Sequence, residues 1–288
     1  MTATFDVAEG GAPLAAAPLT RSSNDEGGER LSRGSGLGLG IAVIWLSLLV
    51  LIPLAAVVAK GFGGGWSGFW TAITRTQALD ALWLTVWTSL LVAAVNAVMG
   101  TLIAWVLVRD KFRGSRLIDI VIDIPFALPT IVAGVVLLSV YGTNSPVAIN
   151  LLGTQRGIAF AMLFVTLPFV VRSVQPVLAA LDLESEQAAA CLGAGPLVIF
   201  RRIVLPLLLP AIASGAALAF ARAMGEYGTV LLIGGGLDRT KVASMYAFQL
   251  HQAFDDQGAA AVATVLLVIS LVVILSLDLI QRRMARRG

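Results

Sequence analysis

The sequence contains few charged side chains, and this absence argues against most soluble classes of protein. Charged residues make up 13% of the 288 positions, whereas hydrophobic residues make up 58%. A soluble globular domain has about 25% charged and about 45–50% apolar residues. A chain this apolar needs lipid around most of its length, which disfavours a soluble enzyme, a nucleic-acid-binding protein and a disordered protein. The net charge of +3 is too small to indicate a nucleic-acid partner.

Cysteine and histidine are almost absent. The single cysteine, Cys191, excludes an intramolecular disulfide, and the single histidine, His251, excludes a metal site that needs several His and Cys ligands. We therefore expect no metal site and no catalytic residue. The pattern GxxxxGK[ST] is also missing, so the chain has no P-loop for ATP. His251 and Asp255 have an H-x-x-x-D spacing that could indicate the base of an acyl-transfer enzyme. Such a spacing often arises by chance.

Long apolar runs dominate the rest of the chain. Six of them exceed the ~10–14 residues of a buried soluble helix. They cover residues 37–59, 81–108, 117–141, 157–181, 203–225 and 258–280. Because backbone polar groups in lipid must be satisfied within the segment, the runs predict helices. The chain is therefore predicted to be an all-α integral membrane protein with six transmembrane helices.

The first residues of the chain differ from the rest in polarity. Residues 1–35 are polar and lack periodicity, which predicts a flexible cytoplasmic tail, and residues 36–288 form the transmembrane domain. The short apolar segment 229–236 either extends the fifth span or folds back at the outer surface. Of the 20 Lys and Arg residues, 13 lie on the side of the N-terminus and five on the opposite side. This bias predicts that both termini are cytoplasmic.

The loop between the fourth and fifth runs has a distinctive order of residue types. Acidic residues that suit a helix N-terminus come first, small alanines follow, and two glycines then precede a proline. Gly193 and Gly195 should end a first short helix, and Pro196 suits the start of a second. Two interpretations stay open: a polar connector, or a docking helix that enters a groove of a partner protein.

The same loop resembles the EAA loop of ABC importer permeases. The matching positions, at the family's spacing, are Gln187, Ala188, Ala189, Gly193, Ile203, Leu205 and Pro206. The resemblance implies a type I, MetI-like permease fold, a core permease over residues 79–280, and a coupling loop over residues 182–203 that inserts into a cytoplasmic ATPase subunit. One departure is that Gln187 replaces the family's usual Glu. Glu186 is the candidate to supply that charge.

Four further segments are similar to sulfate/thiosulfate importer permeases, with the T-type subunits of the CysT family as the nearest group. They cover residues 125–134, 141–146, 164–176 and 220–228. The last segment is shared with molybdate permeases, so a molybdate or tungstate importer is the alternative. The 144–146 loop and the 172–176 stretch favour sulfate.

The resemblance implies a multi-subunit complex in the bacterial inner membrane. Its other members would be a second, W-type permease, two ATPase subunits that use ATP and Mg²⁺, and an extracytoplasmic sulfate-binding protein. This chain would form half of the translocation pathway, contact membrane lipid and hold no cofactor. ATPase closure would pull on the docking helix 184–192 and drive alternating access.

Charged residues inside the apolar runs are the remaining candidates. Arg222 and Glu226 lie four residues apart in the fifth run, as an internal ion pair or as part of a pathway or gate. Arg172 is expected to snorkel towards the cytoplasm, and Asp123 is expected near the inner interface. Prolines 125, 129, 168 and 176 are expected to kink helices rather than to line a cavity.

Two classes of function other than a permease stay open. A secondary transporter would have an inverted repeat and intramembrane carboxylates for ion coupling, but no such repeat is visible and an EAA-type loop has no purpose in it. A membrane-embedded enzyme would need a nucleophile and a base that converge. The single Cys and the single His are predicted on opposite sides of the membrane, which argues against an enzyme.

Overall fold

The protein is helical throughout the part of the chain that the structure, a computed structural model, describes, namely residues 33–110 and 112–285. The α-helices are α1 (Arg33–Leu46), α2 (Ile52–Gly61), α3 (Gly65–Thr74), α4 (Thr76–Arg109), α5 (Ser115–Ala127), α6 (Thr130–Tyr141), α7 (Gln155–Ala180), α8 (Leu183–Cys191), α9 (Pro196–Ile199), α10 (Leu205–Met224), α11 (Gly228–Gly234), α12 (Ala243–Gln252) and α13 (Asp256–Ala285). Two π-helices, η1 (Ser47–Leu51) and η2 (Phe200–Val204), and one 3₁₀-helix, η3 (Asp238–Thr240), complete the set. The predicted tail falls largely on residues outside the described ranges.

Two compact units divide the chain between Val50 and Leu51. In the first unit, α1 and most of η1 form one helical segment whose described side chains are almost all exposed. Such exposure of leucine, isoleucine and valine suits a helix surrounded by lipid. The second unit contains the remaining helices, which pack around common cores.

Five helical segments are long and apolar enough to cross a membrane. They are Gly38–Gly61, Thr76–Arg109, Gln155–Ala180, Pro196–Met224 and Asp256–Leu279. Each coincides with one of the predicted runs, and the pair α5 and α6 raises the number of spans to six if it counts as one. The prediction of an all-α membrane protein is confirmed.

The third predicted span is broken rather than continuous. Helices α5 and α6 meet at an angle of 117°, far beyond a simple kink, so the expectation of kinks alone was wrong here. Leu128 ends α5 in an extended conformation, with φ −85° and ψ 132°. The residue before a proline is disfavoured in the helical region, and Pro129 imposes this on Leu128. By contrast, Pro168 and Pro176 lie inside the continuous helix α7.

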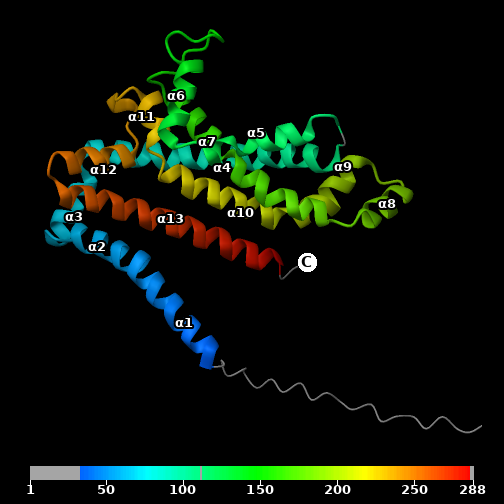
Figure 1. Ribbon diagram of the computed structural model, residues 1–288, viewed down its shortest axis with the longest axis horizontal. Helices are drawn as coiled ribbons and strands as arrows, with labels where there is room; N and C mark the ends of the chain where they lie inside the picture. Colours follow the sequence, from blue (N-terminus) through cyan, green and yellow to red (C-terminus); the bar gives the residue numbers. More distant parts are fainter. Residues whose placement is uncertain (1–32, 111, 286–288) are drawn as a thin grey trace, which may run out of the picture. The chain divides into compact units, whose positions relative to one another are not determined.

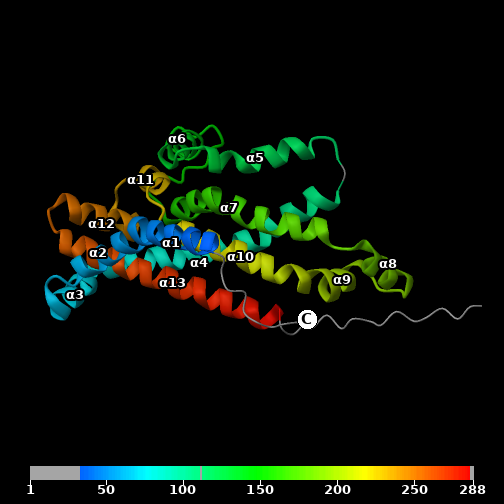
Figure 2. The same cartoon turned by 60° about the horizontal axis from the view of Figure 1, so that its bottom comes forward.

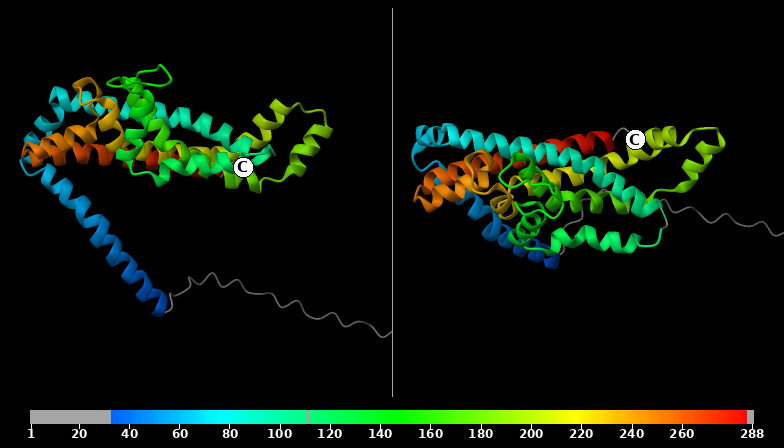
Figure 3. Two further views of the ribbon diagram at one scale, coloured as in Figure 1. Left: turned by 45° about the horizontal axis from the view of Figure 1, so that its top comes forward. Right: turned by 90° about the horizontal axis from the view of Figure 1, so that it is seen from above.

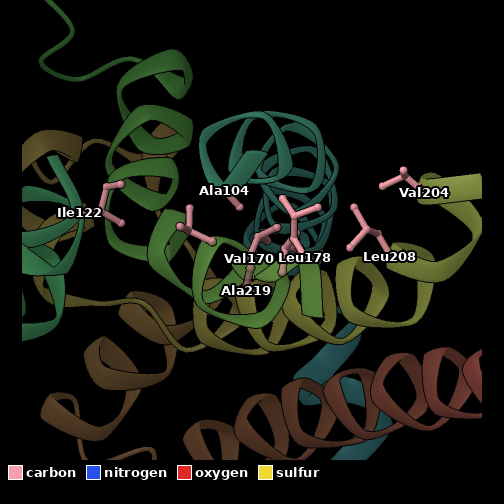
Figure 4. Packing of buried hydrophobic residues seen from close by; sticks show 9 residues of the cluster. Ala104, Ile122, Val170, Leu178, Val204, Leu208 and Ala219 are labelled. Carbon is pink, nitrogen blue, oxygen red and sulfur yellow. The ribbon is translucent and has the colours of Figure 1, made fainter. Parts of the chain in front are cut away.

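The core of the second unit lies between α4, α7 and α10. Figure 4 shows part of it, where Val170 and Leu178 of α7 meet Ala104 of α4 and Ala219 of α10. Two glycines allow the close approach. A Cβ at Gly100 would lie 2.8 Å from the Val170 side chain, and one at Gly215 would lie 2.7 Å from the Val170 Cα. Small residues at such contacts are how transmembrane helices pack closely without a hydrophobic driving force.

A second break separates α10 from α11 at Gly225–Tyr227. The segment 229–236 therefore does not extend the span, because it belongs largely to the separate helix α11, which packs against α6; its position at the outer surface stays a prediction. Helix α6 runs across the direction of α4, α7 and α10 (Figure 1) and is viewed nearly along its axis in Figure 2. A Cβ at Gly228 would lie 2.3 Å from Thr130 Oγ1, so the first turns of α6 and α11 touch.

The two ends of the helical bundle carry different loops. Helices α8 and α9 project beyond one end, and α3 and α12 lie at the other (Figure 1). Both views of Figure 3 show the α8–α9 segment, in yellow-green, standing clear of the bundle. The loop that resembles a coupling element is therefore separated from the α12–α13 turn by the full length of the spans.

Candidate functional site

The α8–α9 segment has the predicted helix–break–helix form. Asp182 caps α8, because its side chain accepts a hydrogen bond of 2.9 Å from the Glu184 amide. Gly193 follows the helix with φ +85°, a left-handed conformation that favours glycine. Pro196 then opens α9 in its first turn. The local sequence therefore dictates a sharp reversal at the tip of this loop.

The tip of the loop exposes apolar side chains. Leu192 is 89% exposed and Leu197 is 76% exposed, and Cys191 is exposed beside them. Apart from its neighbours in sequence, no atom of the described residues lies within 4 Å of a Cβ added at Gly193 or at Gly195. Apolar groups that project at the end of the bundle, away from the spans, form a surface that suits a partner protein.

The remaining positions of the predicted coupling set lie along the same loop. Gln187 and Ala188 are exposed on α8, whereas Ala189 is partly buried. Ile203 belongs to η2, and Leu205 and Pro206 begin α10. Between them, Val204 is buried in the core of α4, α7 and α10. The structure therefore brings the first half of the motif to the surface and anchors the second half at the start of a span.

Glu186 turns inward and forms an ion pair with Arg109, the last residue of α4. Both side chains are largely buried, with 16% of Arg109 and 19% of Glu186 exposed. The hypothesis that Glu186 presents the missing charge of Gln187 to a partner is therefore wrong for this conformation, because its carboxylate is already engaged within the chain.

Arg222 and Glu226 form an ion pair at the break between α10 and α11. Arg222 donates a 2.6 Å hydrogen bond to Glu226, whose side chain is only 1% exposed. Glu226 also accepts bonds from the backbone amide, at 3.0 Å, and from the hydroxyl, at 2.7 Å, of Thr229. It thereby caps α11 and fixes the α10–α11 break. Arg222, with 31% of its side chain exposed, is the member of the pair that a solute can reach. A pathway or gate role for the two residues stays a prediction.

Arg172 is held by side chains of α5 and of its own helix, and its predicted snorkelling towards the cytoplasm stays a prediction. Its guanidinium donates to Asp123 Oδ1 at 2.8 Å and to Asp119 Oδ1 at 2.8 Å, and it also bonds to Gln175 Oε1 at 2.7 Å. Charged groups at membrane depth are costly unless they are paired. Helix α5 brings two carboxylates within reach of α7, so the charge of Arg172 is paired within the chain. The cluster ties the first half of the broken span to the core.

The α12–α13 turn holds a third set of charges. Arg75 donates to Asp255 at 2.8 Å, and this bond, followed by one from the Gly258 amide, lowers the pKa of Asp255 below its ordinary value. His251 pairs with Asp256 at 2.6 Å, not with Asp255. The H-x-x-x-D spacing therefore forms no paired His and Asp of a catalytic kind.

Arg109, Trp105 and Asp119 are the residues that sequence reasoning missed. Arg109 was counted only among the positive charges near span ends. Its Cζ lies 5.5 Å from the centre of the Trp105 ring, and this ring meets Phe200 of η2 edge-on at 5.3 Å. A Trp one helical turn before a terminal Arg is a weak signal, and nothing in the sequence indicated the partner of either.

The chain is similar to known proteins in sequence and in fold. The family model for the inner membrane component of binding-protein-dependent transport systems matches residues 96–287. The chain belongs to this family. It is the membrane permease component of an ABC transporter, not the ATPase, and it is a multi-pass inner membrane protein. The prediction of a transporter subunit rather than an enzyme is confirmed.

Curated relatives sharpen the resemblance. The sulfate transport system permease protein CysT of Salmonella typhimurium is 40% identical over 266 residues, which cover 90% of this chain and 96% of the relative. The protein of the same name from Escherichia coli K12 has the same identity and coverage. CysT of Synechocystis is 40% identical over 250 residues, 84% of this chain and 87% of that protein. The predicted similarity to the T-type family is confirmed.

Solved structures support the fold. The chain is similar to a bacterial alginate ABC transporter in complex with an alginate-bound periplasmic protein, with a TM-score of 0.73, 16% identity and coverage of 86% and 94% of the two chains. An inward-facing MetNI methionine ABC transporter gives a TM-score of 0.56 at 19% identity, with coverage of 73% and 99%. The MetI-like permease fold is confirmed.

Proposed function

We propose that this chain is the T-type permease subunit of an ATP-driven importer of sulfate and thiosulfate. The observation that carries the proposal is 40% identity to CysT permeases over nearly the whole length of both chains. The projecting α8–α9 element is the structural counterpart, since a permease without an ATPase domain needs a surface that engages one.

The complex contains four kinds of subunit. We assign to it a second, W-type permease, two copies of an ATPase and an extracytoplasmic sulfate-binding protein. The surplus of Lys and Arg at the end that carries α8 supports a cytoplasmic position for this end and for both termini. The α12–α13 turn then faces the binding protein.

The α8–α9 segment is the docking surface for the ATPase. Its exposed residues include Gln187, Ala188 and Gly193, with the apolar Leu192 and Leu197 beside them. Small side chains on α8 permit a groove to close around the helix, and the exposed leucines supply apolar area to bury. Ile203, Leu205 and Pro206 join this surface to α10.

Alternating access follows from how α8 is connected. Helix α7 leads into α8, and α9 and η2 lead into α10, so a displacement of the loop acts on two core helices. When ATPase subunits close on ATP, the two permeases rotate and the cavity between them opens outward to receive sulfate from the binding protein. The break before α6 lies between the two halves of the third span, where irregular backbone is tolerated if it lines a cavity, and the break before α11 follows the end of the span that contains α10. Arg222 and Glu226 lie at the second break.

Uptake measurements test the substrate. Cells that lack this chain and have no redundant sulfate transporter should lose uptake of labelled sulfate and recover growth on cysteine. Re-expression of the intact chain should restore uptake. Normal sulfate uptake together with a selective loss of molybdate uptake would reassign the substrate to the related oxyanion.

Co-purification tests the partner. The chain, tagged and extracted from its own membranes, should bring down the ATPase subunit, and a Cys191→Ser variant should do so equally because only one atom changes. Recovery of the chain without any ATPase would contradict the importer mechanism, whatever the substrate.

A further inference from the structure

The contact between α8 and α4 distinguishes this loop from a simple connector. Arg109 and Glu186 are 77 positions apart in sequence, yet their side chains form an ion pair. Within the described residues, no other side-chain hydrogen bond links α8 to a helix of the bundle. The pair therefore joins the docking helix to a span with which it has no direct chain connection.

Packing alone does not hold α8 in place. The helix has nine residues and none of them is fully buried, although Glu186 and Ala189 are partly buried. At its far end, the backbone reverses at Gly193, where an added Cβ would meet no described atom within 4 Å beyond the adjacent residues. A short helix without buried apolar area has little that fixes its tilt, so a largely desolvated ion pair at its middle has a large effect on its orientation.

Arg109 also packs on Trp105, whose ring contacts η2, the segment that leads from the loop into α10. The guanidinium lies over the Trp105 ring, and the edge of that ring meets Phe200, the first residue of η2. The last turn of α4 thus contacts α8 through the Arg109–Glu186 ion pair and η2 through the Trp105–Phe200 ring pair. Arg109 Nε is buried without a hydrogen-bond partner, which shows how completely this end of the side chain is enclosed.

We infer that Arg109 is a positioning residue that transmits the movement of the docking helix to α4. This inference rests on the proposed function, since it presupposes that α8 docks on the ATPase. Helices α7 and α10 follow the loop because the chain connects them to it. Helix α4 follows it through the Arg109–Glu186 pair, and its packing against α7 and α10 makes the three spans move together.

The arrangement also explains the departure from the family motif. Gln187, at the position of the usual Glu, is exposed and available to the ATPase. The neighbouring acid, Glu186, is turned towards Arg109. Recognition of the partner and attachment to α4 are therefore assigned to adjacent residues on different faces of α8.

The test uses the complete complex of both permeases, the ATPase and the binding protein in proteoliposomes. Arg109→Gln should leave ATPase co-purification and the KM for sulfate unchanged but lower sulfate transported per ATP hydrolysed by about tenfold, the effect expected for loss of a charged hydrogen bond. Arg113→Gln is the matched control, because it removes a charge four positions from Arg109 that forms no ion pair with any residue that the structure describes. Glu186→Gln should reproduce the uncoupling, and the exchanged pair R109E/E186R should recover part of it.

Two outcomes would overturn the inference. Arg109→Gln could couple as well as Arg113→Gln, or it could lose ATPase binding and transport together with no recovery in the exchanged pair, which would indicate a purely structural role. Failure of the proposed function looks different, because the unaltered chain would then not bind the ATPase at all.

Discussion

Gly193 offers the sharpest test of the docking surface, because its backbone conformation and its surroundings act separately. Its φ of +85° lies in the left-handed region, where a residue with a Cβ pays about 1–2 kcal/mol. Such an amount shifts a conformational equilibrium by roughly 5–30-fold. Since no atom of the residues that the structure describes, the adjacent ones aside, lies within 4 Å of an added Cβ, a clash with the rest of the permease is not expected to add to this strain.

These facts predict a graded series at one position. Gly193→Ala should weaken ATPase association by about the cost of the backbone strain, that is by roughly 5–30-fold. Gly193→Asp should abolish ATP-driven sulfate uptake, because strain, bulk and a negative charge act together on the partner-facing tip. Neither change touches an apolar span, so both variants should insert into the membrane at normal levels.

Gly195 provides the matched control. It also has open space around an added Cβ, but its φ of −71° is available to any residue and it is the N-cap of α9, where Asp is favoured. Gly195→Ala and Gly195→Asp should therefore retain more ATPase association than their counterparts at Gly193. The assay is uptake and co-purification at matched membrane levels. Full transport by Gly193→Asp, with the ATPase still bound, would remove this loop from the mechanism.

Three further predictions concern packing, orientation and pH. Gly215→Val, which overpacks α7, should destabilise the folded permease by about 1–3 kcal/mol in a detergent unfolding assay, whereas Gly40→Val meets no atom within 4 Å and should have little effect. Phe254→Cys, at a turn residue 95% exposed, should react with an impermeant thiol reagent in intact cells of a Cys191→Ser background; labelling only after lysis would reverse the topology. The lowered pKa of Asp255 stabilises the fold above its unfolded value of about 3.9, and this contribution is lost as pH falls through the folded value. Between pH 5 and pH 3 the melting temperature should therefore fall further in the unaltered chain than in Asp255→Asn, and equal falls would contradict the assignment.

The number and limits of the spans were predictable because lipid imposes a simple rule on sequence. Every long apolar run became helical, the third as the two helices α5 and α6, and the runs agree with the observed segments to within a few residues except before α10. The break at Leu128 was not predictable in the same way. Pro168 and Pro176 lie within an unbroken helix, and Pro129 does not, although Pro129 and Pro168 both follow a leucine. The difference depends on the packing of α6 against α11, which is a tertiary contact.

The partners of the buried charges were also beyond the reach of sequence patterns. A count of Lys and Arg near span ends treats each as a charge in water, which suits the orientation of the chain. Arg172 instead binds carboxylates 49 and 53 positions away, and these become neighbours only when α5 lies along α7. Pairing of this kind needs the fold, because the sequence offers several acids at similar distances.

The direction of α8 shows where prediction from the motif ends. Adjacent residues on an α-helix point about 100° apart, so Glu186 and Gln187 cannot both face the same partner. The motif fixed the spacing and the glycine at which the helix ends, and both agree with the structure. Which face turns towards the bundle depends on Arg109, a residue outside the motif on another helix. A glutamate beside the family position therefore serves attachment to α4, and the neutral Gln187 is left at the surface. If charge at position 187 mattered for docking, Gln187→Glu should tighten ATPase association in co-purification. We expect no increase in ATPase association, because the exposed side chains of this tip are apolar and small. A clear increase would show that an acid at position 187 strengthens docking.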